Sequence, residues 1–215
     1  MGTIQLSIGP AVAALFALPL SPFPPLAVGF FGLGTGYLIY GPQELLHYPK
    51  RELGERVDYG TGVWGIWMPG FMQFLTGTYL FLGLTLSVTF RTPALYMAGL
   101  AFTAYGVHWF ALGWNRLHGI DVRVNLGMTV AFTLISILGI IVFFGAHDNP
   151  VGGLFIGLTC VYVADFVASL APDLPGIGAL GERALGFFHI TVGFWLMYLT
   201  FAAALNFALG YTLPL

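Results

Sequence analysis

Charged residues are scarce in this sequence: only 7% of its 215 residues are Asp, Glu, Lys or Arg, against 58% that are hydrophobic. A soluble domain normally carries about 25% charged residues, so this composition cannot cover a surface that faces water. It excludes a soluble enzyme, a nucleic-acid-binding protein and a disordered tail. The sequence is therefore that of an integral membrane protein, and we expect it to be multi-pass in the cell (plasma or inner) membrane.

Cysteine is equally scarce, because Cys160 stands alone inside an apolar run. This excludes an internal disulfide and a cysteine-based metal cluster. The histidines are far apart, and none has the i, i+4 spacing of a ligating helix. No Gly-x-Ser-x-Gly elbow is present, and no Lys or Arg precedes the first apolar stretch, as a signal peptide would require. We predict no catalytic residues, no metal site and no cofactor, so the protein is not expected to be an enzyme.

Long apolar runs are what the sequence does contain. A helix needs about 20 apolar residues to cross the hydrocarbon core, and six stretches meet or approach that length. Because they are continuously apolar and do not alternate, we predict an all-α membrane protein and not a barrel. The connections are short, so residues 1–215 form a single transmembrane domain. The predicted spans are residues 25–41, 62–84, 93–114, 124–145, 151–171 and 183–209.

Prolines interrupt the apolar start of the chain. They include Pro19, Pro22, Pro24 and Pro25, and each proline removes a backbone donor and clashes with the preceding turn. We predict a broken or re-entrant N-terminal segment that leads into a first span beginning near Pro24 or Pro25. A seven-span arrangement, in which the first residues cross separately, is the alternative.

Glycines are numerous in the first predicted span. Gly32 and Gly36 stand one helical turn apart and share a face, with Gly29 and Gly34 nearby. In membranes, faces of small residues let helix backbones approach closely. We interpret these glycines as packing residues rather than as ligands of a solute.

The basic residues predict an orientation. Breaks one, three and five hold nearly all of them, and breaks two and four hold only Arg91. The positive-inside rule therefore places the odd-numbered breaks in the cytoplasm and both termini outside. The residues of the odd breaks and their flanks are Lys50, Arg51, Arg56, Arg116, Arg123 and Arg183.

Polar side chains inside the apolar spans are the candidate functional residues, because each is costly in hydrocarbon unless it has a partner. Gln73 follows Pro69, which we expect to kink the second span. Thr103, Tyr105 and His108 lie in the middle of the third span, and Asn206 lies in the sixth.

Structural roles are the alternatives for these residues. Gln73 can bond a carbonyl of a neighbouring helix, and Tyr105 with His108 can form a packed pair. We interpret Asp165 and His189 as lying close to the membrane interface, where water solvates them.

Several stretches resemble the acetate uptake transporter family, the succinate–acetate permeases. Residues Ala101–Trp109 resemble its Ala-Phe-Ser/Thr-Ser-Tyr-Gly-x-Phe-Trp stretch, with His108 in place of phenylalanine, and Gly70–Gly77 resemble its Gly-x-x-Gln-x-x-x-Gly. Pro25–Val28 with Phe31 and Gly32 are similar to the end of its Asn-Pro-Ala-Pro-Leu-Gly-Leu signature, although the asparagine is missing. Its sixth span and tail are matched by Trp195, Tyr198, Asn206, Gly210 and Thr212–Leu215.

The resemblance implies six helices around a central pore in each protomer, and protomers that assemble as a homo-oligomer, usually a hexamer. It implies uptake of acetate or succinate-like carboxylates, coupled to protons or passed as in an anion channel. The family's pore narrows at a Phe–Leu–Tyr constriction, and the matching positions here are Phe31 and Tyr105.

A pore for a carboxylate must offer hydrogen-bond donors where water is stripped away. The predicted substrate-binding residues are Phe31, Gln73, Thr103, Tyr105, His108 and Asn206. Since histidine titrates near physiological pH, we hypothesise that a protonated His108 attracts the carboxylate and carries its proton. The expected partners are thus a small carboxylate, protons and the lipid bilayer, with no nucleic acid. Two alternatives stay open: an accessory subunit of a larger membrane complex, and a channel for small neutral solutes.

Overall fold

The computed structural model describes residues 23–50, 55–86, 90 and 92–215. The broken or re-entrant segment predicted before Pro24, and Arg91, lie outside this part of the chain. Within it every regular element is a helix. The helices are α2 (Phe23–Leu46), α3 (Glu55–Gly65), η2 (Ile66–Phe71), α4 (Met72–Thr85), α5 (Pro93–His118), η3 (Val122–Asn125), α6 (Leu126–Gly145), α7 (Asn149–Ala168) and α8 (Pro175–Leu209).

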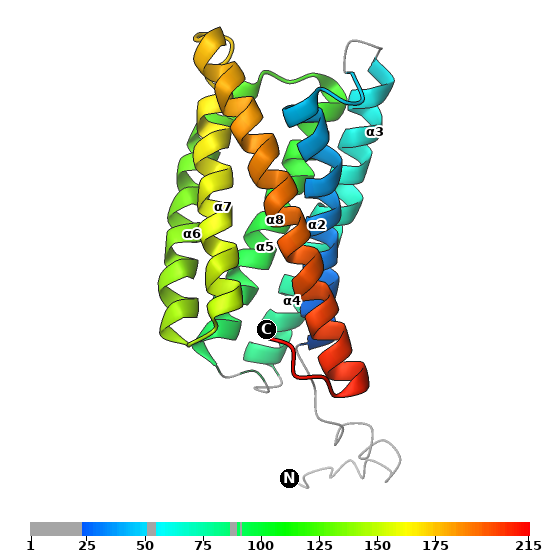
Figure 1. The fold of residues 1–215 in the computed structure, drawn as a ribbon, viewed down its shortest axis with the longest axis vertical. Coiled ribbons are helices and arrows are strands. Elements are labelled where there is room, and N and C mark those ends of the chain that lie inside the picture. The colour runs from blue at the N-terminus through cyan, green and yellow to red at the C-terminus, as the bar shows by residue number, and fades with distance from the viewer. Residues whose placement is uncertain (1–22, 51–54, 87–89, 91) are drawn as a thin grey trace, which may run out of the picture.

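The helices form a closed ring of six members (Figure 1). Going around it, α2 packs against α8, α8 against α7, α7 against α6 and α6 against α5; α5 then packs against the continuous unit α3–η2–α4, which returns to α2. Each member runs antiparallel to its neighbours. Four members are long and apolar enough on their own to cross a membrane: Pro93–His118, Val122–Gly145, Asn149–Ala168 and Pro175–Leu209. The all-α membrane fold is as predicted, and a ring of this kind leaves an axis along which cavities can lie.

The second ring member contains a π-helical turn. It runs from Glu55 to Thr85, but residues Ile66–Phe71 have π-helical hydrogen bonding around Pro69. Proline has no backbone N–H, and widening the turn accommodates the lost bond without ending the helix. We expected a kink at Pro69; the structure has a π-helical turn there, one turn before Gln73.

Glycines bring α2 against this distorted helix. A Cβ added at Gly32 would lie 2.6 Å from the carbonyl oxygen of Met68, and one at Gly36 would lie 2.6 Å from Cγ of Pro69. Real Cβ atoms essentially never approach so closely. The packing role predicted for Gly32 and Gly36 is confirmed, because both positions need the absence of a side chain.

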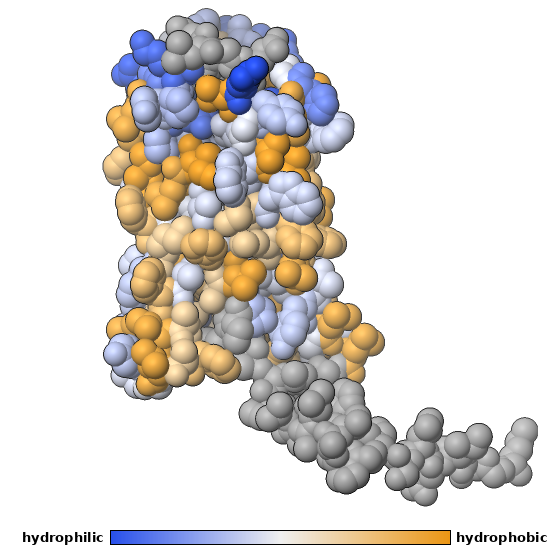
Figure 2. Space-filling model, turned by 90° about the vertical axis from the view of Figure 1, so that its right-hand side faces the viewer, coloured by the Kyte–Doolittle hydropathy of each residue, from blue (hydrophilic) through white to orange (hydrophobic). Residues whose placement is uncertain are grey.

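Polar and basic residues gather at one end of the bundle. Figure 2 shows one face, on which the hydrophilic colours are concentrated at the end where α3 begins and α5 ends. Every Lys and Arg that the structure describes belongs to the connections or helix ends on this side: Lys50, Arg56, Arg116, Arg123 and Arg183. The chain's C-terminal residues lie toward the opposite end (Figure 1). This distribution matches the charge pattern on which the predicted orientation rests.

Candidate functional site

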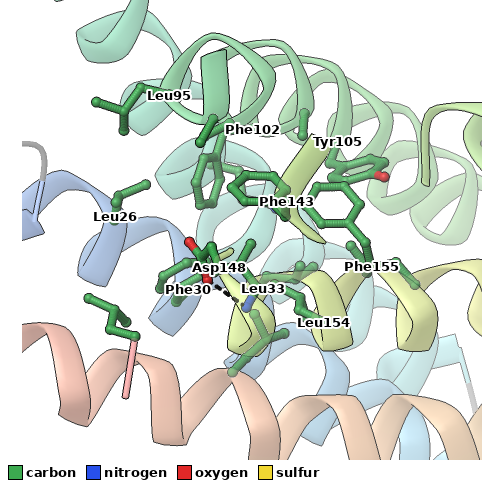
Figure 3. Close-up of a pocket in the computed structure, with 18 of the residues that line it drawn as sticks. Leu26, Phe30, Leu33, Leu95, Phe102, Tyr105, Phe143, Asp148, Leu154 and Phe155 are labelled. Carbon is green, nitrogen blue, oxygen red and sulfur yellow. Dashed lines mark hydrogen bonds between the residues drawn. The ribbon is translucent and has the colours of Figure 1, made fainter. Parts of the chain in front are cut away.

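A cavity of about 250 Å³, here called cavity 1, occupies the half of the ring remote from the basic end. Its wall is almost entirely aliphatic and aromatic, as Figure 3 shows. The exceptions include Gln73 on α4 and, near the end of the bundle, Thr92 and Asp148, which precede the first turns of α5 and α7. Asp148 is its one charged lining residue among those described. The shape and lining suit a small, partly apolar solute.

Gln73 is buried in the wall of cavity 1 without a protein partner. It is only 1% exposed, and neither Nε2 nor Oε1 has a hydrogen-bond partner in the described structure. A buried polar group left without a partner costs about 1–3 kcal/mol. The bond to a neighbouring carbonyl that was the structural alternative for Gln73 is not formed, so its amide remains available to a guest in the cavity.

A second cavity, cavity 2, of about 200 Å³ occupies the half nearer the basic end. Its wall is far more polar than that of cavity 1 and includes acidic, basic and aromatic side chains from α2, α5, α7 and α8. The polar or aromatic members are Tyr37, Tyr40, Glu44, His108, Trp109, Arg116, Asn125, Tyr162, Asp165, Ser169, Glu182 and His189.

The two cavities follow one another along the axis of the ring. On α5 the lining passes from cavity 1 at Tyr105 to cavity 2 at His108, and on α7 it passes from Leu158 to Val161. The cavities share no lining residue among those described. Between them lies a closed waist, which we define as Tyr37, Tyr105, Trp109, Leu158, Tyr162 and Leu196, all 2% exposed or less. A hydrated ion cannot pass such a barrier without losing water or moving these side chains.

Tyr105 contributes its ring, rather than its hydroxyl, to the waist. Its ring stacks on Tyr162 with the centroids 5.7 Å apart. Its hydroxyl oxygen lies 3.0 Å from Oγ of Ser136, whose own proton is donated to the carbonyl of Phe132 at 2.7 Å. The Tyr105 hydroxyl therefore donates to Ser136 and points toward α6. We expected Tyr105 to be a donor to the solute; the geometry makes it an aromatic wall.

His108 lies in the wall of cavity 2 with both ring nitrogens buried and unpartnered in the described structure. Its ring packs 4.9 Å from that of Phe132, centroid to centroid. Thr103 also has a buried hydroxyl without a partner, but it lines a groove between α5 and α6 rather than either cavity. The expected pore position of Thr103 is thus corrected, whereas His108 remains available for a polar contact.

Phe31 faces outward. It is 42% exposed, whereas the preceding residue, Phe30, is 3% exposed and lines cavity 1 (Figure 3). Successive helical residues are separated by about 100° around the axis, so Phe30 and Phe31 point in different directions from the same helix. Phe30 replaces Phe31 as the aromatic residue of α2 in the cavity wall.

Asn206 holds the C-terminal residues against α8 instead of lining a cavity. Its Nδ2 donates to the carbonyl of Leu213 at 2.8 Å, and the Leu213 N–H donates to its Oδ1 at 2.9 Å. The Tyr198 hydroxyl donates to the carbonyl of Pro214 at 2.9 Å. Leu215 then forms part of the wall of cavity 1. The predicted pore role of Asn206 is replaced by a structural one: it fixes a strap, residues 210–215, beside the cavity.

Removing the Asn206 side chain is expected to loosen the strap. In Asn206→Ala, amide hydrogen exchange at Leu213 should accelerate at least tenfold, because two hydrogen bonds worth about 1 kcal/mol each are lost. Thr212→Ala, a change within the strap that removes no described hydrogen bond, is the control. Unchanged exchange at Leu213 in Asn206→Ala would show that other contacts hold the strap.

Comparison with known proteins supports the fold. No protein-family model and no curated protein sequence matches the chain. A solved structure does: the bacterial acetate channel SatP, with a TM-score of 0.63 and 19% sequence identity, over 90% of this chain and 97% of that chain. At that identity the likeness establishes a shared helical membrane fold. It carries no residue assignments.

Sequence reasoning missed the most polar contact inside the ring. Nδ1 of His189 lies 2.6 Å from Oε2 of Glu44, and both side chains are buried. We expected His189 at the membrane interface, and Glu44 was not among the predicted site residues. Asp165, also expected near the interface, lines cavity 2. The rule that intramembrane ionisable residues pair with one another would have connected Glu44 and His189, had the first span been extended to Leu46.

Proposed function

We propose that the protein is a membrane channel or transporter for small monocarboxylates such as acetate, with succinate as a further candidate, and that proton movement accompanies their passage. The solute enters cavity 1, crosses the waist when its aromatic residues move apart, and leaves through cavity 2. The acetate channel with a similar fold supports this class of solute, and the family resemblance of the third span agrees with it.

The unpartnered amide of Gln73 is the observation that carries the proposal. Cavity 1 offers apolar walls for a methyl group and, at Gln73, a donor for a carboxylate oxygen. A neutral donor binds an anion only weakly, and weak binding suits a pathway that must release its solute quickly. An accessory subunit that only packs against partners has no need of buried amides facing a cavity.

The scarcity of fixed cations in cavity 1 favours coupling to protons. Its only charged lining residue among those described is an acid, Asp148. An ionised solute finds no cation to pair with in this cavity and is repelled by the Asp148 carboxylate. A protonated solute is not repelled. The same feature favours a second candidate, the passage of small neutral solutes such as urea or small amides.

Flux measurements with purified protein in liposomes test the function directly. We expect labelled acetate to enter faster than into protein-free vesicles, at a pH where most acetate is ionised, and an inward proton gradient to accelerate it. Labelled urea is measured in parallel. Protein-dependent flux of urea with none of acetate would support the neutral-solute channel, and flux of neither would contradict both.

Asp148 is expected to make acetate flux depend on pH. Burial raises the pKa of its carboxyl group above the ordinary value, although the Val151 N–H, donating at 3.1 Å, opposes the shift. As the pH falls, the proton is therefore bound earlier than by an exposed aspartate, and the mouth of cavity 1 loses a negative charge. In Asp148→Asn, acetate flux at neutral pH should rise about fivefold, from roughly 1 kcal/mol of repulsion removed.

Asparagine is the suitable replacement because it also caps helix N-termini well. The slope of acetate flux against pH should flatten in the same variant. If the pH profile of Asp148→Asn matches that of the unaltered protein, the charge at the mouth does not control entry.

Assembly and location complete the proposal. We propose a homo-oligomer, a hexamer by the family resemblance, in the plasma or inner membrane, with one pathway in each protomer. Native mass spectrometry of the purified protein measures the number of protomers. A stable monomer that still transports acetate would show that the pathway needs no partner copy.

A further inference from the structure

Cavity 2 contains a buried acid–base pair that joins two helices. Glu44 on α2 and His189 on α8 meet at 2.6 Å, with side chains 8% and 6% exposed. Burying ionisable groups away from water is unfavourable unless they pair, and neither residue is needed to close the waist. Such a pair inside a membrane-spanning bundle points to a functional role.

The fold holds the two side chains at a fixed separation. One turn before the pair, α2 and α8 touch through glycines: a Cβ added at Gly186 would lie 2.7 Å from the carbonyl oxygen of Gly41. The ring of Tyr37 covers the imidazole of His189, with centroids 4.4 Å apart. Packing against the Tyr37 ring therefore orients the imidazole, whose Nδ1 faces Glu44.

The four long helices around cavity 2 all contribute charged or titratable groups that affect the charge of this pair. Tyr37 and Tyr40 come from α2, His108 and Arg116 from α5, Tyr162 and Asp165 from α7, and Glu182 from α8. Arg116 is the one permanent cation of this lining, and it is already engaged by Asp58 at 2.6 Å and by Gln43 at 2.9 Å.

Asp165 is one of three carboxyl groups in the lining of cavity 2, with Glu44 and Glu182. It accepts a hydrogen bond from Oγ of Ser169 at 3.4 Å, and no cation lies within ion-pair distance among the described residues. The carboxyl groups in this lining therefore outnumber its one permanent cation, Arg116, which is paired with Asp58. Each proton that these groups bind makes the charge of cavity 2 less negative.

We propose that the Glu44–His189 pair is the proton-loading site of transport, an inference that rests on the carboxylate transport proposed above. With a carboxylate and a neutral imidazole, the pair has a charge of −1; after taking one proton from water, its charge is zero, whichever side chain holds the proton. A carboxylate solute in cavity 2 is repelled by the first state and accepted by the second. One anion and one proton then occupy the cavity together and leave together, so no net charge crosses.

This assignment differs from the hypothesis that His108 carries the proton. His108 has no acidic partner among the described residues, and its neighbours are aromatic rings. His189 has the Glu44 carboxyl group within hydrogen-bond distance, whereas neither ring nitrogen of His108 has a partner in the described structure.

Current measurements on protein-containing membranes distinguish these assignments. Uncharged acetic acid that leaks through lipid carries no current, so only ionic acetate movement is recorded. The unaltered protein should show protein-dependent labelled-acetate flux with almost no acetate current. In Glu44→Gln the pair is neutral without a proton, while the amide oxygen still accepts from the imidazole. This variant should carry an acetate current at least tenfold larger, and its labelled flux should no longer respond to a proton gradient.

Three further variants guard the interpretation. His189→Gln removes the base of the pair, so coupling should again be lost. Asp173→Asn makes the same kind of change, from acid to amide, at an exposed carboxylate that lines neither cavity, and it should stay electroneutral. His108→Phe is expected to slow flux but to remain electroneutral.

The outcomes separate failure of this inference from failure of the proposed function. Absence of protein-dependent acetate flux in the unaltered protein overturns the function itself. Normal electroneutral flux in both Glu44→Gln and His189→Gln overturns only the role of the pair. Loss of coupling in His108→Phe, with coupling kept in Glu44→Gln, would restore His108 as the proton carrier.

Discussion

Replacing Gln73 by leucine is expected to lower acetate flux at least tenfold while raising the thermal midpoint of the protein. The amide has no protein partner in the described structure, so leucine removes an unfavourable buried polar group worth about 1–3 kcal/mol. The same change removes the donor that cavity 1 offers to a carboxylate. A hydrogen bond to a charged group contributes about 1.5–3 kcal/mol, and each 1.4 kcal/mol corresponds to about tenfold in binding.

A lower acetate flux together with a higher thermal midpoint is expected only if the Gln73 amide binds the solute. Gln43→Leu is the matched control, because Gln43 is also a buried glutamine but its amide is fully engaged: Nε2 donates to Thr61 at 2.8 Å and Oε1 accepts from Arg116 at 2.9 Å. That variant should lose thermal stability. If Gln73→Leu also lowers the thermal midpoint, or leaves acetate flux intact, the amide has a structural role instead.

The fold could be predicted because apolar runs of span length leave the chain few choices. Every predicted span corresponds to a ring member, and the prediction failed mainly at the ends of spans. The first helix runs to Leu46 and the last begins at Pro175, beyond the apolar stretches, since side chains such as Glu44 and Glu182 face a polar cavity rather than lipid. Composition reports the average surroundings of a segment and does not show which face of it is polar.

The site could be predicted only in part. A sequence indicates how far along a membrane span a residue lies, but not which way its side chain points. Gln73 and Tyr105 line cavity 1, but Tyr105 directs its hydroxyl to Ser136, a partner 31 positions away on another helix. Asn206 was chosen as a polar residue in an apolar span, and its partner is the strap that follows. The Glu44–His189 pair spans 145 positions. Such pairings depend on how the helices are rotated against one another, which the motifs do not specify.

Alanine at Gly106 is expected to destabilise the ring. A Cβ there would lie 2.5 Å from the backbone nitrogen of Phe74 and 2.9 Å from the carbonyl oxygen of Gly70. Both atoms belong to the backbone of the neighbouring helix and cannot rotate away, so α5 and α4 must separate beside Gln73. Overpacking of this kind costs about 1–3 kcal/mol, and the thermal midpoint of the purified protein in detergent should fall accordingly.

Gly127 provides the control for Gly106, because it is also a helical glycine but has nothing within 4 Å of an added Cβ. Alanine there gains about 0.5–1 kcal/mol from the lower flexibility of the unfolded chain, so the thermal midpoint of Gly127→Ala should rise slightly. The two substitutions differ only in their surroundings. A fall of the thermal midpoint in Gly106→Ala and a rise in Gly127→Ala would demonstrate the close contact of α4 and α5. Equal midpoints for the two variants would mean that these helices are further apart than described, and that Gln73 is then not held against cavity 1 by this contact.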